Sequence, residues 1–279
     1  AQAQGSSGSL ARLAFPLTAC VSVVFSLRVP PPHLAALAMA PTVVIIGGTG
    51  KTGKWAVKGA VVRGYTVRVL GRSPDKVAAV LRELFPDRPQ EQLLSEVAVV
   101  QGDVNNQETL AELFRGADVV LSFLGMVKPP QWVVRPGVES IIETLKTMQR
   151  PPRFISMSSI SVGDSLAQGR RAWGRCVTCL VWKVFLTACF KDMQAAEEYI
   201  VEAKDSLDVT VMRATILGDK SGYLKDYSQA GNRSYRLVKA DETAARLTFT
   251  VDRQDVAEAF LDACGRSVSY GPFISIFGI

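Results

Sequence analysis

The apolar positions after residue 41 fall into short runs that alternate with longer, mixed segments. Runs rich in valine and isoleucine predict five buried strands, at residues 42–46, 66–70, 97–101, 118–123 and 153–157. The segments between them, such as 107–115 and 133–149, have the mixed pattern of helices that cover a sheet. This alternation predicts an α/β fold, a Rossmann-type doubly wound parallel sheet whose ligands bind beyond the carboxyl ends of the strands.

A glycine-rich turn follows the first predicted strand, with the spacing G-x-x-G-x-x-G. A turn of this kind between a buried strand and a helix start presents backbone N–H groups to a pyrophosphate, and glycine allows the close approach. A purely structural glycine turn is the alternative interpretation. The cofactor-binding residues predicted in the turn are Gly47, Thr49, Gly50, Lys51, Thr52 and Gly53.

An ATP-binding P-loop is the rival interpretation of the same residues, and its pattern is incomplete. In the register that runs from Gly48 to Gly53, Lys54 is followed by Trp55, where a hydroxyl that binds magnesium is needed. ATP hydrolysis is therefore not expected.

The second predicted strand ends in Gly71, Arg72 and Ser73. An acidic residue at this point would bind a ribose 2′-hydroxyl, whereas a guanidinium beside a hydroxyl suits a 2′-phosphate. Arg72 and Ser73 therefore predict NADPH as the cofactor in preference to NADH.

Small and polar residues follow the next three strands, where a dinucleotide would lie. Asp103 would accept a hydrogen bond from the adenine, with a turn cap as the alternative, and tight packing is the alternative for the residues that end the fourth strand. For the serines that end the fifth strand, beside the expected nicotinamide, the alternative is a loop hydroxyl that caps its own backbone. The candidates are Asp103, Val104, Ser122, Gly125, Ser158 and Ser159.

Composition limits the chemistry that the chain can perform. The 279 residues are 48% hydrophobic, enough for one sizeable core, and the net charge of +6 is spread out, so nucleic acid is not an expected partner. The only histidine is His33, so Ser-His-Asp hydrolysis and ordinary histidine metal sites are not expected in the folded part, and no metal site is predicted. Cys176 and Cys179 form a lone C-x-x-C within an apolar stretch, which favours packing of reduced thiols.

Residues 1–38 differ from the rest of the chain, since no Asp or Glu precedes Asp75. They resemble a leader, a signal or transit segment, or translated upstream sequence, and we exclude them from the predicted domain at 39–279. Translation from Met39 would give a cytoplasmic protein, whereas a transit peptide would direct the chain to a plastid or mitochondrion. No transmembrane span is expected, because the apolar run from 13 to 27 is shorter than a bilayer requires.

The segment 170–190 begins with arginines and Trp173 and continues as an apolar run from Cys176 to Phe190. We expect a core helix here, with contact with a protein partner or a membrane surface as the alternatives.

From residue 42 to 279 the chain resembles the atypical short-chain dehydrogenase/reductases of the NmrA-like, NAD(P)H-binding group, which includes biliverdin-IXβ/flavin reductase-type proteins. The glycine turn matches, apart from Gly48 where alanine is usual. The group's Asp-Met-x-x-x-Glu helix resembles residues 191–197, its "SGLDWTIVRP" strand resembles 206–213, and its "YR" and "ISRADVA" segments resemble 235–236 and 250–257.

The chain departs from typical dehydrogenases of this family in its catalytic residues. These place a tyrosine four residues before a lysine, but the position four before Lys191 is Thr187, and Tyr199 lies on the wrong side. Ser158 and Lys191 remain the candidate catalytic residues, with a solvated helix-end lysine as the alternative for Lys191.

The leading functional hypothesis is an NADPH-dependent oxidoreductase that reduces a small conjugated, quinone- or flavin-like acceptor, with water or Ser158 as the proton source. A non-catalytic NADPH-sensing regulator or scaffold is the alternative. An isomerase or epimerase that uses NAD is disfavoured by Arg72 and by the missing tyrosine. Residues 160–190 and 219–250 are the segments expected on the substrate side.

Overall fold

The computed structural model describes residues 40–125, 132–174, 180, 187–219, 235–239, 247–264 and 272–278. The expected leader, the C-x-x-C pair and most of the apolar run from 176 to 190 lie outside the described residues. Residues 40–279 form one compact unit.

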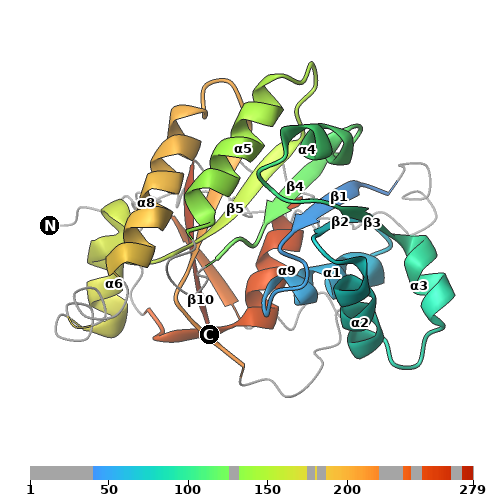
Figure 1. Ribbon diagram of the computed structural model, residues 1–279. Helices are drawn as coiled ribbons and strands as arrows, with labels where there is room; N and C mark the ends of the chain where they lie inside the picture. Colours follow the sequence, from blue (N-terminus) through green and yellow to red (C-terminus); the bar gives the residue numbers. More distant parts are fainter. Residues whose placement is uncertain are drawn as a thin grey trace, which may run out of the picture. The chain divides into compact units, whose positions relative to one another are not determined.

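A mostly parallel sheet forms the centre of the described part, with the strand order β3-β2-β1-β4-β5-β6-β10-β8 (Figure 1). Neighbouring strands pair in parallel except β8, which runs antiparallel to β10. Two shorter strands, β7 and β9, form a separate parallel pair. The bounds are β1 (Thr42–Ile46), β2 (Thr66–Gly71), β3 (Val97–Gln101), β4 (Val119–Ser122), β5 (Arg153–Ser159), β6 (Val209–Ala214), β7 (Ile216–Gly218), β8 (Tyr235–Lys239), β9 (Thr250–Asp252) and β10 (Phe273–Gly278).

The predicted Rossmann-type fold is confirmed, and each of the five predicted strands is present within a residue or two. Strands β1 and β4 are almost wholly buried, because helices cover both faces of the sheet. This burial explains why their sequences are continuous apolar runs rather than alternating ones. The strand order reverses at β1, which lies between β2 and β4, so the carboxyl end of β1 marks the crevice where ligands of this fold bind.

Helices cover the two faces in separate layers (Figure 1). Helices α1, α2, α3 and α9 pack on one face, and α4, α5, α6 and α8 on the other. The bounds are α1 (Gly53–Val62), α2 (Pro74–Leu84), α3 (Gln90–Glu96), α4 (Gln107–Phe114), α5 (Val134–Lys146), α6 (Leu166–Trp173), α8 (Thr187–Glu202) and α9 (Arg253–Cys264), with a short 3-10 turn at Gly163–Ser165. None of these described helices is both long enough and apolar enough to span a bilayer.

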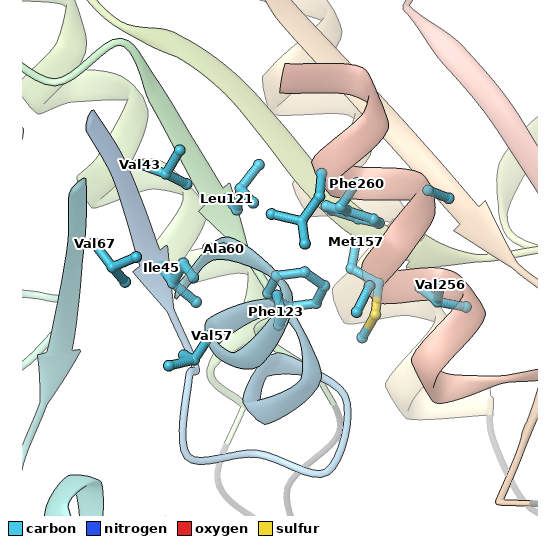
Figure 2. Packing of buried hydrophobic residues seen from close by; sticks show 14 of the residues in the cluster. Val43, Ile45, Val57, Ala60, Val67, Leu121, Phe123, Met157, Val256 and Phe260 are labelled. Carbon is cyan, nitrogen blue, oxygen red and sulfur yellow. The ribbon is translucent and has the colours of Figure 1, made fainter. Parts of the chain in front are cut away.

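The core between α1, α9 and the sheet continues up to the carboxyl end of β4 (Figure 2). Phe123, just beyond β4, packs on Phe260 of α9 with ring centroids 4.6 Å apart. Met157 of β5 belongs to the same core. The floor of the crevice is therefore well packed and apolar.

Candidate cofactor site

The turn after β1 is built around glycine backbone. Gly47 has φ of +80°, a conformation that side-chain-bearing residues rarely adopt, and its carbonyl accepts a hydrogen bond from the Gly50 N–H at 2.9 Å. A Cβ at Gly53 would lie 2.2 Å from that same carbonyl oxygen. Only glycine therefore permits the first turn of α1 to start this close to the end of β1.

The N-terminus of α1 suits an anion. The first N–H groups of a helix have no acceptor within the helix, and the helix dipole places partial positive charge there. No Asp or Glu lies in the first turn of α1, and Lys51 beside it is exposed. These groups fit the pyrophosphate of a dinucleotide.

A cavity of about 940 Å³ begins at this turn and runs along the carboxyl ends of the strands. Eleven of the residues predicted to lie along the cofactor line it: Gly47, Thr49, Gly50, Lys51, Thr52, Arg72, Asp103, Val104, Gly125, Ser158 and Ser159. Three others, Gly53, Ser73 and Ser122, do not line it. Gly53 acts from beneath the turn, and Ser122 is buried at the end of β4.

Arg72 lies at the edge of the cavity, beyond β2. Its side chain is exposed and has no ion-pair partner among the described residues. Ser73 follows it at the N-terminus of α2, where its hydroxyl makes no capping hydrogen bond. A cation without a protein partner, at the edge of the cavity, fits a phosphate group.

Asp103 makes the turn interaction that was its alternative role. Its Oδ1 accepts hydrogen bonds from the backbone N–H of Asn105 at 2.9 Å and from Asn105 Nδ2 at 2.8 Å. Asp103 and Asn105 nevertheless both line the cavity. Both of these hydrogen bonds use Oδ1, and the residue is exposed, so the turn interaction is compatible with ligand binding. Asn105 was not predicted from the sequence.

Ser158, the last but one residue of β5, has an unusual environment. It is 5% exposed, and its Oγ has no hydrogen-bond partner among the described residues. Leaving a buried hydroxyl unpaired costs about 1–3 kcal/mol. Because Ser158 also lines the cavity, a ligand bound there would satisfy the hydroxyl.

The far end of the cavity, beyond Ser158, is apolar. It is lined by Met157, Trp173, Phe190, Met193, Ala214, Thr215, Ile216 and Leu217, which come from four separate parts of the chain. Thr215 has its hydroxyl fully used, since Oγ1 accepts from Trp173 Nε1 at 3.0 Å and donates to the carbonyl of Phe249 at 2.7 Å. Arg253 is the one charged lining residue at this end among those described, and it pairs with Asp219 at 2.5 Å.

Sequence comparison gives the family of the chain. Residues 47–266 match the NAD(P)H-binding family. The chain belongs to this family. The glycine turn, the apolar far end and the unpaired Ser158 hydroxyl described above fit a nicotinamide dinucleotide, so the cofactor class follows from the family and from the site together. No curated protein sequence matches the chain.

Solved structures with the same fold include three that are informative. They are the anaerobilin reductase ChuY from Escherichia coli O157:H7 (16% identity, 85% of this chain and 97% of that one, TM-score 0.60), the oxidoreductase ylbE from Lactococcus lactis (17%, 85% and 91%, 0.61) and a short-chain dehydrogenase/reductase from Veillonella parvula in complex with NADP (16%, 86% and 95%, 0.58). The expected NAD(P)H-binding family is confirmed by the family match, and these structures confirm the expected fold. At these identities the structures establish the fold alone.

The family's Asp-Met-x-x-x-Glu helix has a distinct structural role at each of its three motif residues. Asp192 accepts hydrogen bonds from the N–H groups of Val134 and Arg135, both at 3.2 Å, and so caps α5. Met193 lines the cavity. Glu197 forms a buried bidentate pair with Arg213 of β6, at 2.9 and 2.7 Å. The motif thus orients α5, builds the cavity wall and ties α8 to the sheet.

Arg213 is the central residue of this support. It is 1% exposed, and its Nη1 also pairs with Asp164, at 2.6 Å, while its guanidinium lies 3.8 Å from the centre of the Phe273 ring. Helix α8, the 3-10 turn before α6 and strand β10 are therefore tied to β6 through one buried cation. In the sequence, Arg213 stands out as an arginine inside an otherwise apolar strand. Its partner Glu197 was recognised only as part of a motif.

Lys191 and Tyr199 lie away from the cavity. Lys191, near the start of α8, is exposed and does not line it. Tyr199 donates a hydrogen bond to Glu143 at 2.6 Å, and this bond raises the pKa of Tyr199 to about 12. No described group of three or more His, Cys, Asp or Glu residues is arranged to hold a metal ion. Lys191 and Tyr199 therefore do not offer a proton at the far end of the cavity.

Within the segments expected on the substrate side, Trp173 and Phe190 line the cavity. Of residues 219–250, strand β8 instead completes the edge of the main sheet, and none of the described residues of this segment lines the cavity. The apolar residues of β5, β6 and β7 that line the far end were not predicted.

Proposed function

We propose that this protein is an NADPH-dependent reductase that transfers hydride to a small conjugated acceptor of the quinone or flavin type. The observation that carries the proposal is that one continuous cavity joins the phosphate-binding turn and Arg72 at one end to an apolar, aromatic wall beside Ser158 at the other. The anaerobilin reductase and the oxidoreductase among the similar structures support the same class of reaction.

At the phosphate-binding end of the cavity, each residue has a proposed role in holding the cofactor. The N–H groups of the turn and Lys51 would hold the pyrophosphate, Arg72 would pair with the 2′-phosphate, and Asp103 would accept from the adenine. Bound NADPH would supply a hydride. The hydroxyl of Ser158, which has no partner among the described residues, would donate a hydrogen bond to the ligand at the far end.

The far wall determines which acceptors are suitable. Apart from the paired Arg253, the described lining there has no titratable side chain. Reduction of an ordinary ketone generates an alkoxide, which needs a positioned acid. A quinone or flavin that gains a hydride instead gives a delocalised anion, which takes its remaining proton from water. Conjugated acceptors therefore match a wall that orients the reactants but provides no acid.

The test begins with cofactor affinity. We expect the Arg72→Ala variant to bind NADPH about ten- to a hundredfold more weakly, which is the range for losing hydrogen bonds to a charged group, and to bind NADH unchanged. Arg82→Ala is the matched control, because Arg82 lies on the exposed side of α2 and its replacement removes the same charge. Titration by nucleotide fluorescence measures both affinities. Equal weakening for NADPH and NADH would contradict the role of Arg72.

Turnover is followed by the loss of NADPH absorbance with menadione and with FMN as acceptors. Steady turnover of either acceptor supports the reductase. Tight NADPH binding with no turnover of any acceptor would favour the alternative, a non-catalytic NADPH-sensing protein.

A further inference from the structure

We propose that Trp173 is the specificity-determining residue of this chain and sets the upper size of the acceptor. The inference rests on the proposed reductase function and concerns the far end of the same cavity. Trp173 is the last residue of α6 and is 6% exposed, so a narrow part of its indole faces the cavity. It is one of the residues that line the apolar end of the cavity.

The indole of Trp173 is fixed in one orientation. Its Nε1–H donates to Thr215 Oγ1 at 3.0 Å, and that hydroxyl in turn donates to the carbonyl of Phe249. The Phe249 ring packs edge-on to the indole with centroids 6.4 Å apart. Rotation of the ring would leave the buried Nε1–H without an acceptor, at a cost of about 1–3 kcal/mol.

Helix α6 itself is anchored at two further residues. Gln168 accepts a hydrogen bond from Ser275 Oγ at 2.6 Å and donates to the Lys239 carbonyl at 3.3 Å, which joins the helix to β10 and β8. Gly169 lies so close to Ser161 that a Cβ on it would be 1.6 Å from Ser161 Oγ. The helix therefore cannot move outward to admit a longer ligand without breaking these contacts.

Two other residues of the wall differ from Trp173 in this respect. Met157 and Met193 have flexible thioether side chains, which adapt to the shape of a ligand. An acceptor can therefore displace the methionines, whereas the indole is the rigid limit. This contrast indicates that substrate size is decided at Trp173.

The experiment compares a two-ring acceptor, menadione, with a three-ring acceptor, anthraquinone-2-sulfonate. For each variant the ratio of the two kcat/KM values is calculated. Comparison of this ratio between variants removes the contribution of the intrinsic reactivity of each quinone. We expect Trp173→Ala in the full chain to shift this ratio toward the larger acceptor by about tenfold or more, the scale on which a pocket discriminates by size. Trp173→Phe gives an intermediate shift, and Thr215→Val, which frees the indole, gives a smaller shift in the same direction.

Trp55→Ala is the matched control, since Trp55 lies on α1 beside Lys54 and Lys58 and does not line the cavity. An unchanged ratio in both Trp173 variants, or the same shift in the control, would overturn the inference. If Trp173→Ala does not fold, Trp173→Phe and Thr215→Val still decide the outcome. If the wild-type protein reduces no acceptor, the proposed function fails separately, and calorimetric binding of the two quinones to the complex with NADP⁺ provides the same ratio.

Discussion

Removal of the Glu197 carboxylate tests how strongly the buried pair with Arg213 holds the structure together. The side chains of the pair are 4% and 2% exposed, so the Glu197→Ala change leaves a guanidinium with less compensation inside the protein. Removal of one member of a buried pair costs about 3–5 kcal/mol.

The lower end of that range applies here. Arg213 keeps the Asp164 carboxylate at 2.6 Å and the Phe273 ring at 3.8 Å, and Asp164 is itself 63% exposed and therefore well solvated. We expect Glu197→Ala to lower the free energy of unfolding by about 3 kcal/mol, a large part of the 5–15 kcal/mol that stabilises a typical domain.

Urea unfolding, followed by far-ultraviolet circular dichroism, measures this loss as a lower transition midpoint. Glu198→Ala is the control on the same helix, because Glu198 is exposed and accepts a hydrogen bond from Gln194, and we expect a change of about 0.5 kcal/mol or less. Replacement of both members, Glu197→Met with Arg213→Met, should cost less than Glu197→Ala alone, because no buried charge is then left without its partner. A loss below about 1 kcal/mol in Glu197→Ala would refute the reasoning.

Two further predictions concern packing and thiol chemistry. A Cβ at Gly48 would lie 2.9 Å from Val69 Cγ1, so Gly48→Ala should destabilise by about 1–3 kcal/mol, and less in a Val69→Ala background; additive losses in a double-mutant cycle of urea midpoints would contradict this contact. Burial raises the pKa of the Cys264 thiol to about 12, so its alkylation by iodoacetamide should still rise about tenfold per pH unit between pH 9 and 10. Mass spectrometry of the peptide that contains Cys264 measures that rate, and a rate that levels off between about pH 9 and 10 would show an ordinary thiol instead.

The fold was predictable because its information is local. A parallel strand that is covered on both faces needs a continuous apolar run, and such a run is visible at 42–46 without any knowledge of its neighbours. The position of β8 was not predictable in this way. Its antiparallel pairing with β10 depends on a partner more than thirty residues away, and nothing in the segment 235–239 specifies that partner.

The two ends of the site differ in the same manner. The turn residues adjoin each other in sequence. The atom that excludes a side chain at Gly53 is the carbonyl oxygen of Gly47, only six residues earlier. The far wall is assembled from residues such as Met157, Trp173 and Met193, which have the composition of an ordinary core. Only the crossovers between strands bring them to one place, so their shared role became visible with the structure.

The two ends of the cavity are also encoded by separate stretches of the chain. Residues 46–105 supply the phosphate-binding end, and residues 157–253 supply the far wall. Under the proposed function, substitutions in the second stretch change which acceptor is reduced while the first keeps its hold on the cofactor. For protein engineering, this separation means that variants with new acceptor ranges can be selected from libraries confined to residues 157–253, and for evolution it offers a route by which relatives diverge in substrate while they retain a common source of reducing power.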